Sequence, residues 1–330
     1  MFTFEFDENQ TMIRQLAQRV AVDQCLPHAG SWSEQSHAPR GLFQTLGASG
    51  LLSMTLPESF GGLAMDHTSV ALALEALAGA DAGAALVVLH HNVRACRALE
   101  ALGAQATQWL ERVAEGEVLL SFGHLRGGAA SWVVGAHQAD AHVLLQTKPD
   151  HVVVRLFLDE DVEREDLDVM GLRSAGVGRV RPTAPAKLEG TIPTDEWAQS
   201  APDVHLGLAA IGLGLGQASF HEGTQYAIER KQFGKRLADF QVTQFKLARM
   251  ATDLEACRML LMSAAQAGTH GSERHARLAQ LAAQRALSCA MHTSDEALQL
   301  HGGYGYTEEY TVERLYRDAR ALSPLLQDMP

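Results

Sequence analysis

A short segment in the carboxyl-terminal third of the chain combines side chains that could hold a nucleotide. Residues 230–235 read Arg-Lys-Gln-Phe-Gly-Lys, and Phe240 and Gln241 follow a few positions later. An arginine, a glutamine and a phenylalanine at a junction of helix and turn can pair with a phosphate, hydrogen-bond a ribose and stack on an adenine. The segment therefore indicates a planar ligand that carries phosphate.

A second segment lies about seventy positions further on. Residues 299–306 read Gln-Leu-His-Gly-Gly-Tyr-Gly-Tyr, and Arg-Asp-Ala-Arg follows at 317–320. Gly302 and Gly303 have no Cβ, so the backbone there could lie against an anionic or flat ligand. Either segment alone is equally well explained by a helix cap with a surface cation nearby, because glycines commonly end helices. The charged residues of 317–320 are interpreted as a structural ion-pair network.

The elements that must position these segments change in character along the chain. Residues 1–120 read as helices and form an N-terminal helical domain. Residues 121–200 are rich in short β-branched runs and predict a small, abbreviated β-domain. Residues 201–330 return to helices, and the two long helices among them are expected to pack as an antiparallel bundle. The expected fold is mainly α.

Within these regions the pattern predicts individual elements. The expected strands are 143–145 and 152–158, paired as a hairpin, with further strands at 167–173 and 177–181. The expected long helices are 237–267 and 272–300, the second ending at the glycine pair. The Gly-Leu-Gly-Leu-Gly run at 212–216 lacks a preceding strand and is interpreted as a helix-packing stretch, not a dinucleotide loop.

Composition excludes several classes of protein. The formal charge of -12 argues against a nucleic-acid surface, and no apolar run approaches the roughly eighteen residues of a membrane span. The four cysteines are scattered, which favours a reducing cytoplasm over disulfides. The fifteen histidines show no zinc-binding spacing along the chain, so no metal site is expected.

Taken together, the two carboxyl-terminal segments resemble the acyl-CoA dehydrogenase family. Residues 46–51 (LGASGL) and 56–62 (LPESFGG) resemble the N-terminal signature of that family. The resemblance implies a fold with a C-terminal four-helix bundle that oligomerises at residues 201–330. It further implies FAD as the cofactor, an acyl-CoA substrate and assembly as a dimer of dimers. It also implies that one chain holds the adenosine and pyrophosphate half of its neighbour's FAD. The residues that match this role are Arg230, Gln232, Phe233, Phe240, Gln241, Gln299, Gly302 and Gly303.

The family's contacts to the isoalloxazine ring are poorly matched. The family has a Thr-Glu-Pro-x-Ala-Gly-Ser-Asp loop, whereas residues 121–130 read SFGHLRGGAA. A Trp-Ile-Thr strand follows in the family, and Trp132 matches its tryptophan. Val134 stands in place of the threonine and offers no hydroxyl to a flavin edge.

The catalytic carboxylate is also missing. Dehydrogenation of the α,β bond of a thioester needs a base for the α-proton while hydride moves to the flavin. The position that matches this glutamate in most of the family is occupied here by Leu326. The position that matches it in a minority of the family is occupied by Val204. Asp328 and His205 are the candidate substitutes, and His205 stands where the family often carries an arginine.

These departures predict a shortened, non-catalytic subunit of a heteromeric acyl-CoA dehydrogenase. In this hypothesis the chain completes the FAD site of a full-length paralogue, which supplies the base. Two alternatives stay open: a homo-oligomeric flavoenzyme with a relocated base and an altered substrate, or a non-enzymatic assembly scaffold. Neither a nucleic acid nor a membrane is an expected partner.

Overall fold

The amino-terminal part of the chain is helical, as expected. The computed structural model describes residues 5–326. Its first helices are α1 (Glu8–Val20), α2 (Ala29–Gln35), α3 (Arg40–Ala48), α4 (His67–Ala78), α5 (Ala82–Leu89), α6 (Arg97–Glu100) and α7 (Thr107–Ala114). Three aspartates fix helix starts: the side chains of Asp7, Asp66 and Asp81 accept backbone N–H groups in the first turns of α1, α4 and α5.

One seven-stranded sheet forms the middle of the chain. Its strands are β1 (Leu120–Arg126), β2 (Ala129–Val133), β3 (Ala141–Thr147), β4 (His151–Leu158), β5 (Val162–Asp166), β6 (Gly178–Pro182) and β7 (Leu188–Pro193). They lie in the order β5-β6-β2-β1-β3-β4-β7, and only β1 and β3 pair in parallel. The predicted hairpin is confirmed, because β3 and β4 pair antiparallel from Thr147 opposite Val152 to Ala141 opposite Leu158.

One predicted strand is wrong. Residues 167–173 do not extend the sheet, because β5 ends at Asp166 and the chain then leaves toward the C-terminal helices. Leu172 adopts a left-handed conformation with φ 56°, and its N–H donates to Asp318 Oδ1 at 2.6 Å. The alternating apolar residues of this segment therefore accompany a contact with the helix that carries Asp318, and not pairing with a neighbouring strand.

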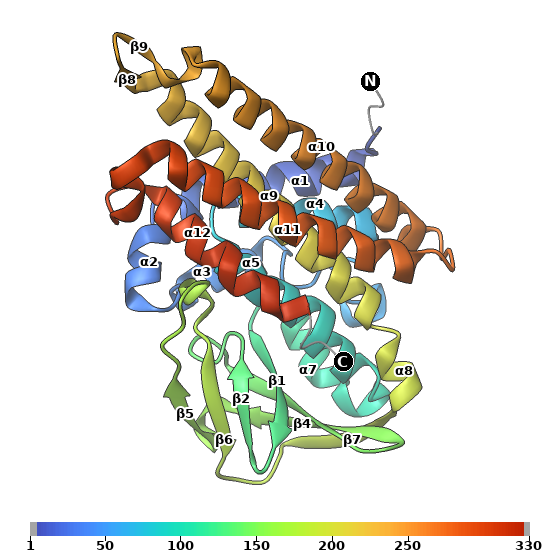
Figure 1. The fold of residues 1–330 in the computed structure, drawn as a ribbon. Helices are drawn as coiled ribbons and strands as arrows, with labels where there is room; N and C mark the ends of the chain where they lie inside the picture. Colours follow the sequence, from blue (N-terminus) through green and yellow to red (C-terminus); the bar gives the residue numbers. More distant parts are fainter. Residues whose placement is uncertain (1–4, 327–330) are drawn as a thin grey trace.

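The carboxyl-terminal part forms the expected helical bundle. Its elements are α8 (Thr194–Ala198), α9 (Ala201–Glu229), the short strands β8 (Lys231–Gln232) and β9 (Lys235–Arg236), α10 (Gln241–Thr269), α11 (His275–His301) and α12 (Thr311–Leu322). In Figure 1 the long helices α9, α10 and α11 run side by side, with the sheet on the far side of the N-terminal helices from α10. Helix α10 begins four positions later than predicted, because residues 237–239 form a 3-10 turn first.

The glycine run at 212–216 lies inside α9, as predicted for a stretch that packs against other helices. A Cβ added to Gly214 would come within 2.3 Å of the backbone oxygen of Glu75 on α4. A Cβ added to Gly212 would lie 3.1–3.3 Å from atoms of Ala286 and Leu287 on α11. Small residues therefore let α9 lie close to two neighbours, and the largest buried cluster of apolar side chains surrounds them.

The fold class predicted from the sequence is confirmed: helices, then a sheet, then a helical bundle. Every helix within residues 5–326 is too short or too polar to cross a bilayer.

Candidate nucleotide-binding site

The two glycine-bearing segments meet at one end of the helical bundle. A pocket of about 560 Å³ opens there. Its lining residues are Tyr226, Arg230, Gln232, Leu237, Leu300, His301, Gly302, Gly303, Tyr304 and Thr307. Four of the predicted site residues (Arg230, Gln232, Gly302 and Gly303) therefore face the same space.

Local backbone geometry explains why these residues meet. Helix α9 stops at Glu229 because Arg230 takes an extended conformation, with φ −72° and ψ 128°. The chain then reverses through a two-residue turn in which Phe233 and Gly234 have φ values of 52° and 82°. Positive φ at both central residues is the geometry that suits a tight hairpin.

The other wall of the pocket begins where α11 ends. Gly302 has φ 60° and ψ −133°, which strongly favours glycine. A Cβ built on Gly302 or Gly303 would meet no atom within 4 Å, so both α-carbons border open space. The central guanidinium carbon of Arg230 lies 5.6 Å from the centroid of the Tyr304 ring.

Aromatic rings hold the floor of this pocket in place. The rings of Tyr226 and His301 stack with centroids 4.0 Å apart, and Tyr310 meets both edge-on. His301 Nδ1 donates to the backbone oxygen of Ala297 at 2.8 Å. Burial lowers the pKa of His301, so its ring is neutral at pH 7 and serves as a packing surface.

The remaining predicted nucleotide contacts lie around this pocket rather than in it. Phe233 is 94% exposed at the tip of the β8–β9 hairpin. The ammonium of Lys235 lies 4.2 Å from the centroid of the Phe240 ring. Gln241 lines a neighbouring groove with exposed apolar residues of α10, and Gln299 is exposed on α11 without lining either space. A single chain thus brings together only part of the predicted set.

The sheet side of the molecule has a different character. Trp132 lies on β2 and is 40% exposed. On the adjacent strand β1, Phe122 and His124 contact the buried side chain of Arg94, whose guanidinium carbon lies 4.7 Å from the Phe122 centroid. The centroid of the Trp197 ring lies 5.2 Å from the same carbon, and the Phe122 and Trp197 rings stack on each other with centroids 5.9 Å apart, so the cation lies beside a pair of stacked rings.

This arginine cluster was missed by reasoning from the sequence. Arg94 is 1% exposed, and its Nε and Nη1 atoms have no hydrogen-bond partner. Burial lowers the pKa of Arg94 to about 10, and burial together with the charge of Arg94 lowers the pKa of His124 to about 4. His90 and His124 are therefore neutral at pH 7, with the pKa of His90 lowered by burial to about 3. A buried cation without a carboxylate is costly unless aromatic faces or a ligand compensate for lost water.

The positions for a catalytic base carry no carboxylate in the described part of the chain. Val204 is fully buried on α9, and Leu326 packs partly buried against the main core. Asp328 lies outside residues 5–326. His205 is half-buried, and its pKa is lowered by burial and by the positive charge of Arg94.

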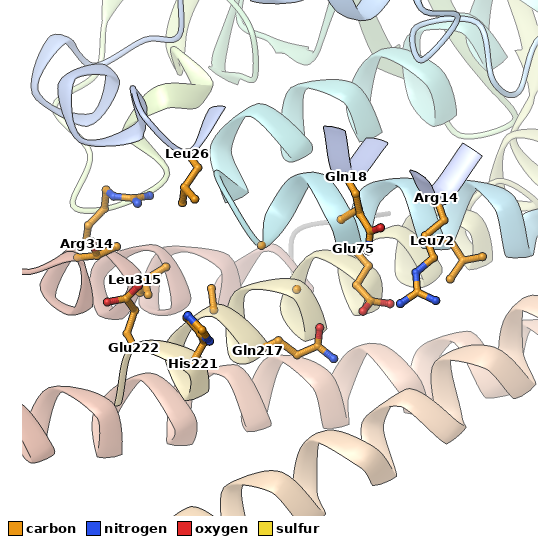
Figure 2. A pocket seen from close by; sticks show the side chains of 15 residues that line it. Arg14, Gln18, Leu26, Leu72, Glu75, Gln217, His221, Glu222, Arg314 and Leu315 are labelled. Atoms are coloured by element: carbon orange, nitrogen blue, oxygen red, sulfur yellow. The ribbon is translucent and has the colours of Figure 1, made fainter. Parts of the chain in front are cut away.

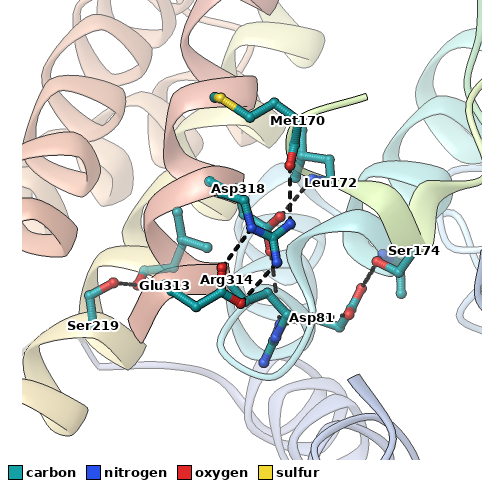
Figure 3. A network of polar contacts seen from close by, with 11 residues as sticks. Asp81, Met170, Leu172, Ser174, Ser219, Glu313, Arg314 and Asp318 are labelled. Carbon is teal, nitrogen blue, oxygen red and sulfur yellow. Dashed lines mark hydrogen bonds and ion pairs between the residues drawn. The ribbon is translucent and has the colours of Figure 1, made fainter. Parts of the chain in front are cut away.

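The Arg-Asp-Ala-Arg segment lies in a polar network that links α5, the loop after β5 and α12 (Figure 3). Arg314 Nη1 lies 3.9 Å from Asp81 Oδ2 and 3.8 Å from Asp318 Oδ2. Arg317 pairs with Glu313 at 2.7 Å and donates to the backbone oxygen of Met170. The interpretation as a structural network is confirmed for Arg317 and Asp318, whereas Arg320 contacts the hydroxyl of Tyr316.

A separate cavity of about 370 Å³ lies between α1, α4, α9 and α12 (Figure 2). Of the two glutamates that line it, Glu75 pairs with Arg258 at 2.6 Å. None of the residues singled out in the sequence as nucleotide contacts line this cavity. It offers no group that connects it to the nucleotide pocket.

Comparison with known proteins identifies the family. Residues 7–117 match the model for the N-terminal domain of acyl-CoA dehydrogenase, and residues 205–325 match the model for its C-terminal domain. The chain is 30% identical to (2S)-methylsuccinyl-CoA dehydrogenase of Cereibacter sphaeroides, over 96% of this chain and 67% of the relative. It is 28% identical to the caffeyl-CoA reductase-Etf complex subunit CarC of Acetobacterium woodii, over 96% and 94% of the two chains.

A solved structure agrees with these matches. The fold is similar to that of a glutaryl-CoA dehydrogenase from Mycobacterium smegmatis in complex with FADH2, with a TM-score of 0.85 and 19% identity over 97% of this chain and 91% of that one. On the sequence relatives and the two domain matches, the chain belongs to the acyl-CoA dehydrogenase family.

Proposed function

We propose that this chain contributes the nucleotide half of an FAD site to a catalytic partner subunit and supplies no base of its own. The observation that carries the proposal is the contrast between its two half-sites. Arg230, Gln232 and the Gly302–Gly303 turn face one open pocket, whereas the base positions Val204 and Leu326 are apolar.

The pocket fits the adenosine and pyrophosphate end of FAD. Arg230 is exposed, and within residues 5–326 no carboxylate forms an ion pair with it, so its donors are available to a phosphate. Backbone at Gly302 and Gly303 can approach a flat or anionic group closely, because no side chain intervenes. All of these groups are accessible on a single chain, as groups donated to a neighbour must be.

The isoalloxazine end of the cofactor fits poorly. Strand β1, which by resemblance carries the flavin-contacting loop, presents Phe122 and His124 to Arg94 and not to an open space. Val134 is buried and has no hydroxyl. These side chains support the loss of this chain's own flavin-binding half-site.

An exposed apolar surface beside the pocket supports a partner. Phe233, Val242 and Phe245 are each more than 60% exposed and lie on the hairpin and the first turns of α10. Clustered exposed apolar side chains of this size mark sites of protein association. The partner would be a full-length paralogue, and the pair would assemble as a dimer of dimers.

In the complex, FAD would supply the hydride acceptor for α,β-dehydrogenation of an acyl-CoA thioester. The partner would supply the carboxylate that takes the α-proton, and Arg230 and Gln232 of this chain would anchor the nucleotide. We also propose a cytoplasmic location, since all four cysteines are buried and unpaired.

The test compares the absorbance of the chain purified alone with that of the chain copurified with a full-length paralogue. We expect a colourless chain alone and a yellow complex. In the complex, Arg230→Ala should remove flavin without disrupting assembly, which size-exclusion chromatography reports, while the exposed Arg19→Ala leaves both unchanged. Stoichiometric FAD in the chain alone, reduced by an acyl-CoA, would contradict the proposal. A complex that keeps its flavin and its assembly in Arg230→Ala would favour a scaffold instead.

A further inference from the structure

Three side chains with metal-ligand chemistry meet where three helices begin. His67 is the first residue of α4, Asp203 lies in the first turn of α9, and His275 is the first residue of α11. The Nε2 atom of each histidine lies 3.0 Å from the same carboxylate oxygen, Oδ1 of Asp203. One ligand atom from each residue lies within 4.8 Å of the other two.

Hydrogen bonding fixes the tautomer of one of these histidines. His275 Nδ1 lies 3.0 Å from the backbone oxygen of Ala264, and a carbonyl can only accept, so this nitrogen carries the hydrogen. In the neutral ring, the lone pair on Nε2 then faces a carboxylate oxygen. Two acceptors at 3.0 Å repel each other, so the arrangement requires either a proton or a metal ion between them.

We propose that His67, Asp203 and His275 bind a Zn²⁺ ion that joins the starts of α4, α9 and α11. Two imidazole nitrogens and one carboxylate oxygen are a ligand set that zinc prefers, whereas Mg²⁺ and Ca²⁺ favour oxygen alone. The bond from His275 Nδ1 to the Ala264 carbonyl is the outer contact that orients a metal-bound histidine.

The surrounding packing leaves room for both rings and for one further ligand. Gly268 on α10 lies against them: a Cβ there would come within 2.8 Å of His275 Cε1 and of His67 Cδ2. A cavity of about 170 Å³ is lined by His67 and Asp203, so a water molecule can complete a tetrahedral shell from that side.

Helix starts carry partial positive charge, which opposes a cation. That effect is weak beside the affinity of two imidazoles and a carboxylate for zinc. The competing occupant is a proton on each ring.

The spacing of histidines in the sequence predicted no metal site, because the ligands are 136 and 72 positions apart in the chain. The proposed site does not depend on flavin or on a partner subunit.

The test is calorimetric titration of ZnCl2 into the untagged full-length chain after EDTA treatment. We expect one zinc per chain, with affinity at least 100-fold lower in each of His67→Ala, His275→Ala and Asp203→Asn. The matched control is His151→Ala, which removes an exposed histidine whose Nδ1 lies 2.8 Å from Asp150 without a third ligand. Its affinity should equal that of the wild type.

A second readout uses the wild-type chain and one packing variant, so it does not depend on the ligand variants folding. Cobalt(II) should give the visible absorption bands of a tetrahedral site, and zinc should abolish them. Gly268→Ala should weaken binding by displacing the rings. Absence of stoichiometric zinc binding, equal weakening in His151→Ala, or imidazole NMR signals that titrate with pH and ignore zinc would overturn the proposal.

Discussion

The guanidinium of Arg230 lies over the ring of Tyr304, with its central carbon 5.6 Å from the ring centroid. This contact joins the hairpin after α9 to the turn after α11, so the two walls of the pocket touch each other. The aromatic face holds the cation without using its N–H donors, which therefore stay available to a phosphate.

Removing the ring should weaken nucleotide binding modestly. Tyr304→Ala leaves Arg230 free to point into water, whereas Tyr304→Phe keeps the aromatic face. An exposed cation–π contact contributes about 0.5–1 kcal/mol, which corresponds to a roughly two- to five-fold loss of FAD affinity. Fluorescence titration of FAD into the apo complex measures this difference. Equal losses in both variants would show that the hydroxyl matters instead of the ring.

Variants of the two glycines after α11 should distinguish the effect of backbone strain from the effect of ligand contact. Gly302 has a positive φ, so Gly302→Ala should lower the free energy of unfolding by about 1–3 kcal/mol. Gly303 has no such constraint, so Gly303→Ala should leave stability nearly unchanged. Both methyl groups would project into open space at the pocket and should weaken FAD binding by the complex. Denaturant unfolding of the chain alone, beside flavin content of the complex, tests both statements.

A glycine variant pair that unfolds alike would contradict the assignment of strain to Gly302. Normal flavin content in both variants would instead remove the turn from the binding site.

The parts of the molecule that the sequence predicted are those built from neighbours in the chain. The turn at Gly302 and the hairpin β3–β4 follow from local conformational preference, and both were predicted. The strand expected at 167–173 failed because Leu172 binds Asp318, a contact across 146 positions that no local pattern reveals. The contact of Arg94 with the rings of Phe122 and Trp197 was missed for the same reason. The lack of a glutamate at positions 204 and 326 could be predicted because it depends on residue identity alone.

The buried carboxylates near α12 should make stability depend on pH. Burial raises the pKa of Asp318 to about 6, and Asp81 adds to the rise while Arg314 opposes it. The folded-state pKa thus exceeds the unfolded value of about 3.9. The unfolded chain loses its proton first as pH rises, so stability falls between about pH 4 and pH 6 and then levels, by up to about 3 kcal/mol.

Asp318→Asn should flatten this pH dependence. The amide oxygen can still accept the N–H of Leu172, and Arg314 keeps Asp81 as its partner. Urea unfolding at a series of pH values between 4 and 7.5 compares the variant with the wild type. The matched control is Asp150→Asn, since Asp150 is exposed and pairs only with His151 in the described structure. An unchanged slope in Asp318→Asn would assign the pH dependence to another group.

The buried Arg94 provides the sharpest test of a non-catalytic role. Arg94→Met replaces a buried cation by an apolar side chain of similar length. Two nitrogens of this cation, Nε and Nη1, have no hydrogen-bond partner. Replacing a buried charged group by an apolar one often leaves stability unchanged or raises it. The free energy of unfolding should therefore change by less than about 1 kcal/mol, whereas Trp197→Ala should cost about 3–5 kcal/mol by opening a cavity. If the chain contributes only nucleotide contacts, acyl-CoA turnover by the complex should be the same with Arg94→Met as with the wild type. A large fall in turnover with flavin content and assembly intact would mean that Arg94 binds substrate, and the chain would then possess an active site of its own.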